Sequence, residues 1–269
     1  MSIISHPTTD DAQEFRGHVI AITGAARGIG QATAELMARR GAAVVLLDRD
    51  AVALRGAVAA LRDAGAKVHG VVAELGDAER VRAAFAEAVE LLGRIDGLVI
   101  NHAVHGAGSV LETTLDQWDL TLSVNLTGAF ACAQEALRVM VPAGGGAIVG
   151  VSSDCAVRSC RDAAAYVATK AALNALMRSI AVDHGADGVR ANIVTPGVTD
   201  TPLLRSAFAA RGTLEESLRA CADQSLVGRI GQVGEIAEAI GFLCGPRSSF
   251  ITGAELIVDG GMTLSYGGD

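Results

Sequence analysis

Aromatic residues, lysines and long apolar runs are scarce in this chain of 269 residues. Aromatics make up 3% of the sequence, and the only lysines are Lys67 and Lys170 among 22 basic residues. No apolar run reaches the ~18 residues that span a bilayer, and the polar start of the chain has no signal-peptide core. We therefore expect no membrane segment and a cytoplasmic location.

The chain also lacks a recognisable cysteine pattern and any excess of basic charge. Its five cysteines are odd in number and show neither metal-ligand nor Cys-x-x-Cys spacing (Cys132, Cys155, Cys160, Cys221 and Cys244). We expect them to be reduced thiols, mostly small apolar fillers. The formal net charge of −8 argues against nucleic acid or an anionic membrane as the main partner.

Half of the residues are apolar, so the chain can bury a large core as one domain. Apolar runs of strand length alternate with helical patterns. The strands are expected at 18–23, 43–48, 67–73, 95–100, 147–151, 189–194 and 255–258, and the longest helical patterns at 50–64, 77–92, 114–141, 163–184 and 233–244. This alternation predicts a doubly wound α/β Rossmann fold, with a mainly parallel seven-stranded sheet and helices on both faces. We expect a loose tail over residues 1–15 and a single domain over residues 16–269.

One of the two lysines follows one of the two tyrosines by four residues, as Tyr166 and Lys170. Residues at i and i+4 lie on the same face of a helix. Lowering the pKa of a tyrosine from about 10 to about 7 takes ~4 kcal/mol, which one cation at ~4 Å supplies in an effective dielectric of ~20. The pair therefore fits a general base with its activating cation. An amphipathic helix with a half-buried tyrosine and a solvated lysine is the alternative.

A glycine-rich segment, Gly24-x-x-x-Gly28-x-Gly30, lies between an expected strand and an expected helix. Without side chains the backbone can approach a pyrophosphate and direct N–H groups of the helix N-terminus at it. A tight strand-to-helix turn without a ligand is the alternative.

Asp48 ends the second expected strand, 18 residues after Gly30. A dinucleotide-binding fold places an acid there, on the 2′-hydroxyl of the adenosine ribose. A carboxylate at this point repels the 2′-phosphate of NADP, so NAD is favoured and NADP is less favoured. Arg27 and Arg49 flank the same pocket and would soften the preference, unless both are simply solvated.

Taken together, the motifs resemble those of the short-chain dehydrogenase/reductase family, single-domain type. The likeness covers residues 17–263, and its motifs occur in the family's order and spacing. They are Thr23-Gly-Ala-Ala-Arg-Gly-Ile-Gly30, Asn101-His-Ala-Val104, Asn125, Ser153, Tyr166-x-x-x-Lys170, Pro196-Gly197 and Asp259-Gly-Gly261. Each motif is weak alone, and together they are specific.

The resemblance implies a role for each matching residue. Tyr166 would be the general acid/base, Ser153 would hydrogen-bond the substrate oxygen, and Lys170 would lower the tyrosine pKa and hold the nicotinamide ribose. Asn125 would keep a water that links Lys170 to solvent. The expected cofactor contacts are Gly24, Arg27, Gly28, Ile29, Gly30, Asp48, Arg49, Glu74, Leu75, Asn101, Ala103, Val104, Tyr166, Lys170, Pro196, Gly197, Thr199 and Thr201. The implied reaction is hydride transfer between NAD and a small secondary alcohol or ketone, in a homotetramer.

The chain departs from the family's pattern in two places. Val104 and His102 interrupt the usual Asn-Asn-Ala-Gly, and Glu74 stands where an aspartate is usual. Neither change removes a catalytic residue. His102 and His105 lack an acid partner in sequence, so we expect no metal site.

Two other functions fit the same motifs. One is a dinucleotide-binding sensor or scaffold without catalysis, although the complete set of catalytic residues disfavours it. The other is an epimerase or dehydratase that uses the cofactor transiently. The substrate is not specified by the sequence; segments 154–162 and 105–110 and a lid over residues 199–226 should line its pocket, where Arg158 and Arg161 are either anion ligands or surface charges.

Overall fold

The computed structural model describes residues 13–209 and 214–264. Residues 1–12 of the expected tail over 1–15, and residues 210–213 of the expected lid, lie outside them. Seven parallel strands form one sheet in the order β3-β2-β1-β4-β5-β6-β7. The strands are β1 (Val19–Thr23), β2 (Ala43–Asp48), β3 (Val68–Val72), β4 (Gly97–Ile100), β5 (Gly146–Val151), β6 (Val189–Pro196) and β7 (Glu255–Val258). The predicted fold class is confirmed, and all seven strands were expected within three residues of their observed ends.

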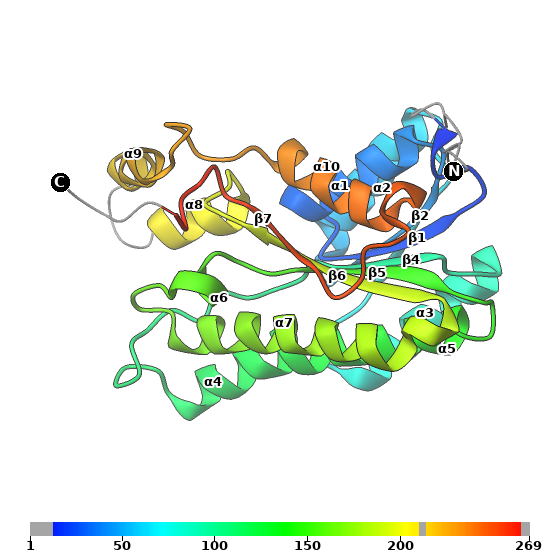
Figure 1. Ribbon diagram of the computed structural model, residues 1–269, viewed down its shortest axis with the longest axis horizontal. Helices are drawn as coiled ribbons and strands as arrows, with labels where there is room; N and C mark the ends of the chain where they lie inside the picture. The colour runs from blue at the N-terminus through cyan, green and yellow to red at the C-terminus, as the bar shows by residue number, and fades with distance from the viewer. Residues whose placement is uncertain (1–12, 210–213, 265–269) are drawn as a thin grey trace, which may run out of the picture.

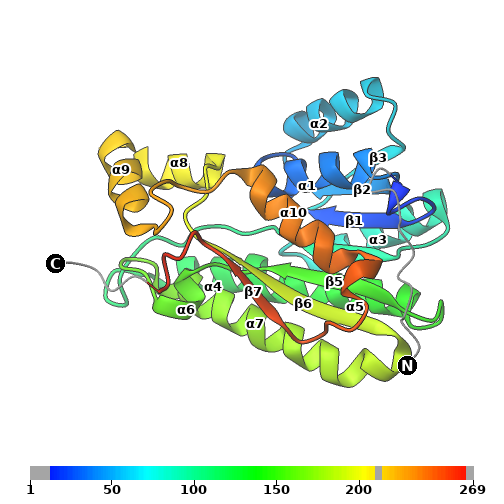
Figure 2. The same ribbon diagram turned by 45° about the horizontal axis from the view of Figure 1, so that its top comes forward.

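Helices cover both faces of the sheet (Figures 1 and 2). One face carries α1 (Gly28–Arg39), α2 (Ala51–Asp63) and α10 (Val233–Cys244). The other carries α3 (Ala78–Leu92), α4 (Leu115–Leu122), α5 (Gly128–Met140) and α7 (Ala164–His184). The central strands β1, β4 and β5 are therefore buried on both sides, which explains why their sequences are continuous apolar runs rather than alternating ones.

Local signals explain where several helices begin. The Asp50 and Asp77 side chains cap α2 and α3 by accepting two backbone N–H bonds each, and Thr114 with Gln117 forms a capping box at α4. The two stretches expected over 114–141 are α4 and α5, joined by the π-helix η2 (Ser123–Thr127). Short α6 (Cys155–Arg158) was not expected, whereas α8 (Pro202–Ala209) and α9 (Leu214–Gln224) lie within the segment predicted as a lid, residues 199–226.

The packed part of the chain begins before residue 16. Phe15 is 1% exposed in the core, and the buried Glu14 carboxylate pairs with Arg40 at 3.3 Å and with Arg247 at 2.9 Å. The predicted tail over 1–15 therefore extends too far, because Glu14 and Phe15 belong to the packed domain. Two charged partners explain how an acid can be buried there.

Candidate active site

The carboxyl ends of the strands open into one cleft of about 1020 Å³. Ligands bind at this edge of doubly wound sheets, because the strand-to-helix loops converge there. All but two of the expected site residues line the cleft; Gly30 and Asn125 are not among its lining residues. Those that do line it are Gly24, Arg27, Gly28, Ile29, Asp48, Arg49, Glu74, Leu75, Asn101, Ala103, Val104, Ser153, Tyr166, Lys170, Pro196, Gly197, Thr199 and Thr201.

The glycine loop forms one end of the cleft. A Cβ atom on Gly30 would lie 2.3 Å from the Gly24 carbonyl oxygen, so only glycine fits behind the loop. The Asn101 amide donates to the same Gly24 oxygen at 2.9 Å and to the Thr23 oxygen at 3.1 Å, which joins the loop to the end of β4. The α1 N-terminus has no side-chain cap, so its first N–H groups suit a phosphate.

Asp48 lies at the end of β2, beside this loop. Its carboxylate accepts from the Ala26 N–H at 3.1 Å and from the Asp50 N–H at 3.0 Å, which fixes its position in the cleft wall. The neighbouring arginines are each paired with an acid: Arg27 with Asp50 at 2.5 Å, and Arg49 with Glu74 at 3.8 Å. The glycine loop can hold the pyrophosphate of a dinucleotide, and Asp48, 18 residues after Gly30, can bind its adenosine ribose.

Tyr166 and Lys170 come from the first two turns of α7. The buried Lys170 ammonium donates to the Val151 carbonyl oxygen at 2.7 Å and lies 5.7 Å from the centre of the Tyr166 ring. Burial lowers the pKa of Lys170 to about 8, because a charged amine is less stable away from water. Lys170 therefore remains mostly protonated at neutral pH.

The expected low tyrosine pKa is not produced by the protein's own groups. Burial of the Tyr166 hydroxyl raises its pKa to about 12, the hydrogen bond with Ser153 lowers it by less, and the Asp154 charge raises it. The lysine contributes little because its ammonium lies near the ring and against Val151 rather than on the hydroxyl. The spacing predicted that both residues lie on one face of a helix, but it did not specify this geometry.

Asn125 lies behind the cleft wall, in the π-helix η2. Its side chain accepts from the Val104 N–H at 2.8 Å and donates to the Val104 carbonyl at 3.0 Å. It also donates to the Thr169 hydroxyl at 3.1 Å, next to Lys170. Val104, a departure from the family's glycine, is thus held by its backbone. The π-turn, a feature often found at functional sites, places the amide where it reaches both elements.

His102, the second departure, is buried beneath the glycine loop. One ring nitrogen lies 3.0 Å from the Val124 carbonyl, which can only accept, so Nε2 carries the proton. The other lies 2.8 Å from the Thr23 hydroxyl. Burial and the Lys170 charge lower the pKa of His102 to about 4, so the ring is neutral. His102 thereby links β1 to the helix that carries Asn125, a structural role that its sequence position did not reveal.

Ser153 follows β5 and faces the same cleft as Tyr166. Its hydroxyl donates to the Asp154 carboxylate at 3.1 Å and accepts from the Cys155 N–H at 3.2 Å. His105, from the loop after β4, lies with its ring centre 5.1 Å from that of Tyr166. These groups surround the position at which a substrate oxygen can hydrogen-bond to the hydroxyls of both Ser153 and Tyr166.

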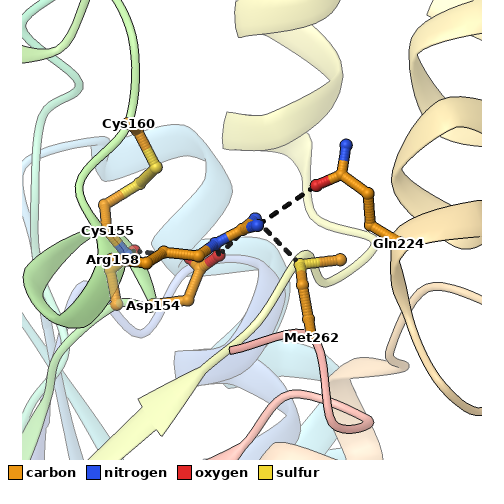
Figure 3. Close-up of a disulfide and its surroundings, with 7 residues drawn as sticks. Asp154, Cys155, Arg158, Cys160, Gln224 and Met262 are labelled. Carbon is orange, nitrogen blue, oxygen red and sulfur yellow. Dashed lines mark hydrogen bonds and ion pairs between the residues drawn. A yellow bond between two sulfur atoms is a disulfide. The ribbon is translucent and has the colours of Figure 1, made fainter. Parts of the chain in front are cut away.

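The expectation of reduced thiols is wrong for two of the five cysteines. Cys155 and Cys160 form a disulfide across α6 and the turn after it, whereas Cys132, Cys221 and Cys244 are free (Figure 3). A separation of five residues matches no common redox or metal motif, so residue spacing did not indicate the bond. Asp154, Cys155 and Cys160 lie close enough together to suggest a metal site, but their sulfurs are bonded to each other rather than free as thiolates.

The site's geometry and the fold together define a dinucleotide-binding oxidoreductase of the doubly wound α/β class. A family model described as Enoyl-(Acyl carrier protein) reductase matches residues 24–263. The chain belongs to the short-chain dehydrogenase/reductase family, whose members use NAD or NADP. The predicted family and reaction class are thereby confirmed.

Three known proteins illustrate the likeness. The chain is 40% identical to cis-4-hydroxycyclohexanecarboxylate dehydrogenase of Sinomonas cyclohexanicum over 93% of this chain and 98% of that protein. It is 36% identical to meso-2,3-butanediol dehydrogenase of Serratia marcescens, over 94% and 97%. A solved structure of a putative short-chain dehydrogenase/reductase from Burkholderia xenovorans is 33% identical with a TM-score of 0.91, covering 95% of this chain and 100% of the other.

Proposed function

We propose that the protein is an NAD-preferring dehydrogenase or ketoreductase for a small secondary alcohol and its ketone, with Tyr166 as general acid/base. The observation that carries the proposal is the convergence of Ser153, Tyr166 and Lys170 at one end of the cleft whose other end holds the glycine loop and Asp48. The bound dinucleotide supplies the hydride acceptor or donor. The two relatives described above are named for secondary alcohols, which supports this substrate class.

The chain's own residues divide the work on the substrate oxygen. The Ser153 hydroxyl exchanges its bond to Asp154 for one to the substrate oxygen, and so orients it toward Tyr166. The Tyr166 hydroxyl takes the proton from an alcohol or gives one to a ketone. Lys170, whose ammonium lies 5.7 Å from the centre of the Tyr166 ring, would hold the nicotinamide ribose. Asn125 holds the helix turn beside that lysine through Thr169.

The NAD preference rests on Asp48. Its carboxylate lies at the cleft wall, and both nearby arginines, Arg27 and Arg49, already neutralise acids. In this part of the described cleft, both arginines are therefore occupied by acids rather than available to neutralise a 2′-phosphate. The Asp48 carboxylate would repel that phosphate. Pro196, Gly197, Thr199 and Thr201 also line the cleft, and we assign them to the nicotinamide.

We also propose a cytoplasmic homotetramer. Large apolar side chains are exposed on α4, α5 and α7, including Leu115 at 79% and Val182 at 83%, and Phe250 before β7 is fully exposed. Such patches usually cover an interface. Among the described helices, none combines the length and apolar character needed to cross a membrane. Sedimentation of the purified protein tests the tetramer.

The decisive experiment for function is a substrate panel with NAD. The panel contains cyclic hydroxy acids, vicinal diols, hydroxysteroids and sugars, and formation of NADH is followed. We expect turnover of at least one secondary alcohol, with net reduction of NAD in proportion to ketone formed. Isomerised or dehydrated product without net NADH would instead indicate an epimerase or dehydratase, and NAD binding without turnover of any panel member would indicate a sensor.

A further inference from the structure

The disulfide between Cys155 and Cys160 lies in the wall of the cleft, at the substrate end. Both cysteines are partly exposed, and both line the cleft together with Ser153 and Tyr166. Figure 3 shows the bond beside the Asp154–Arg158 pair, with Gln224 and Met262 approaching from other segments. A small reagent that enters the cleft can therefore reach the sulfur atoms.

The bonded segment holds Ser153 directly. The Cys155 N–H donates to the Ser153 hydroxyl oxygen at 3.2 Å, and the Asp154 carboxylate accepts that hydroxyl's proton at 3.1 Å. The orientation of the hydroxyl therefore depends on where the first turn of α6 lies. A movement of α6 changes the hydrogen bonds of the group that we assign to the substrate oxygen.

Local interactions alone do not stabilise the conformation of α6 and the turn after it. Helix α6 spans four residues, far fewer than the ~12–15 needed for a helix to hold alone in water. Ser159 follows it with φ 61° and ψ 158°, a conformation that is almost restricted to glycine, and Asp162 also has a positive φ of 53°. The covalent bond across this turn restrains it, and a chain without the bond can relax toward ordinary backbone angles.

Helix α6 is also connected to the predicted lid. The Arg158 guanidinium bonds to the Asp154 carboxylate at 3.0 Å, to the Gln224 side chain at 3.1 Å and to the Met262 sulfur at 3.0 Å. Gln224 ends α9, so one arginine joins the disulfide turn to the lid helix and to the segment after β7. Relaxation of the turn would loosen both Ser153 and this bridge.

We propose that Cys155 and Cys160 form a thiol–disulfide exchange site, whose partner is a dithiol reductant and whose oxidised state positions Ser153 for the reaction. The kinetic part of this inference rests on the proposed function. In a cytoplasmic protein such bonds are usually transient or redox-sensing, because that compartment keeps thiols reduced. The site thus couples substrate turnover to the thiol state around the enzyme.

The exchange needs no reactant other than the dithiol, because its atoms and electrons then balance. A thiolate of the dithiol attacks one cysteine sulfur, the Cys155–Cys160 bond breaks, and a mixed disulfide forms while the released cysteine takes a proton. The second thiol of the reductant then displaces the remaining cysteine. The protein gains two electrons and two protons, and the reductant leaves as a disulfide. A low-molecular-weight disulfide reverses both steps.

The first test establishes the bond. The full-length protein is equilibrated with oxidised glutathione or with dithiothreitol, and thiols are counted after denaturation. We expect three thiols in the oxidised state, those of Cys132, Cys221 and Cys244, and all five in the reduced state. Trypsin cuts after Arg158, between the two cysteines, so only a Cys155–Cys160 bond joins the two resulting peptides. Five thiols after oxidation, or a different linked pair, would overturn the proposal.

The second test measures the consequence. With any alcohol that the enzyme oxidises, reduction should lower kcat/KM by about tenfold, while the Kd for NAD changes by less than about twofold. Cys155→Ser and Cys160→Ser should each show the low value and no response to dithiothreitol. Cys221→Ser, which removes a cysteine from α9 rather than from the bond, should keep the tenfold response. An unchanged kcat/KM after full reduction of the wild type would refute the coupling to Ser153.

A readout that needs no substrate separates this inference from the proposed function. Under brief digestion of the native protein, cleavage after Arg158 and Arg161 should be several times faster in the reduced state and in Cys160→Ser. If no alcohol is oxidised but the rate of this cleavage still depends on the redox state, the exchange site is supported and the proposed function fails. Equal cleavage in both states would show that the bond does not restrain the turn, and the inference would fail.

Discussion

The two ends of the cleft are built by different means. At the end that we assign to the cofactor, glycines without side chains and fixed backbone groups shape the wall: a Cβ atom on Gly30 would lie 2.3 Å from the Gly24 oxygen, and two backbone N–H groups bond to Asp48. At the substrate end, the wall is made by a four-residue helix, a disulfide and the side-chain bridge from Arg158 to α9. The first end needs particular residue types at fixed spacing, whereas the second depends on contacts between segments far apart in sequence.

Replacing Lys170 with arginine should give the largest loss among substitutions that keep a charge. The Lys170 ammonium is buried against the Val151 carbonyl, and a planar guanidinium cannot reproduce this compact contact. We expect kcat to fall by at least about a hundredfold. Lys67→Arg is the matched control, since the exposed Lys67 lies outside the cleft and its variant should retain full kcat. Similar kcat values for the two variants would remove the lysine from the mechanism.

Asp48→Ser should change the choice of cofactor. The substitution removes the carboxylate that opposes a 2′-phosphate, so the ratio of kcat/KM for NADP to that for NAD should rise by about ten- to a hundredfold. Asp63→Ser, which removes an exposed acid at the end of α2, should leave the ratio unchanged. A wild type that already prefers NADP, or a Ser variant without gain, would contradict the assignment of Asp48.

The lid should be protected by the cofactor. Helices α8 and α9 each hold an arginine, Arg205 and Arg219, at which trypsin can cut. Gly28 in the glycine loop faces Pro202 and Thr201, so a dinucleotide on that loop would contact the start of α8. We expect NAD to slow cleavage at both arginines severalfold, while cleavage at Arg55 in α2 keeps its rate. Cleavage at Arg205 and Arg219 that is equally slow with and without NAD would instead indicate a helical hairpin that is permanently packed.

Ser159→Gly should give the smallest effect, a gain in stability. Glycine adopts the observed positive φ without strain, and the relief of strain exceeds the extra entropy of the unfolded chain by ~1 kcal/mol. In the oxidised protein we expect Tm to rise by about 2 °C. The same change at Ser179, in the middle of α7, should lower Tm by about as much. A fall in Tm for Ser159→Gly would show that the turn is not strained.

Most of the fold was predictable because the strands are short apolar runs and the helix starts carry capping residues such as Asp77. The cofactor end was predictable for a related reason: a backbone that must approach a ligand requires glycine at particular positions, and such requirements leave a sequence pattern. The placement of Asp48 in the cleft wall agrees with that pattern.

At the substrate end, the motifs predicted Ser153, Tyr166 and Lys170, but residue spacing did not predict the geometry around them. The Cys155–Cys160 bond depends on a turn through Ser159 in a conformation that serine rarely adopts, so no local propensity indicated it. The position of the Lys170 ammonium against Val151, rather than on the tyrosine hydroxyl, depends on tertiary packing. The role of His102 likewise arises from two partners, Thr23 and Val124, on other elements.

The assignment of Tyr166 as the acid/base is tested most directly by comparing turnover and NAD binding in Tyr166→Phe. The variant keeps the ring beside His105 and above Lys170 and loses only the hydroxyl. We expect kcat to fall by ~10²–10⁴-fold or more while the Kd for NAD stays within about twofold of the wild type. A variant that keeps more than about a tenth of the wild-type kcat would contradict it, because the proton would then move through another group.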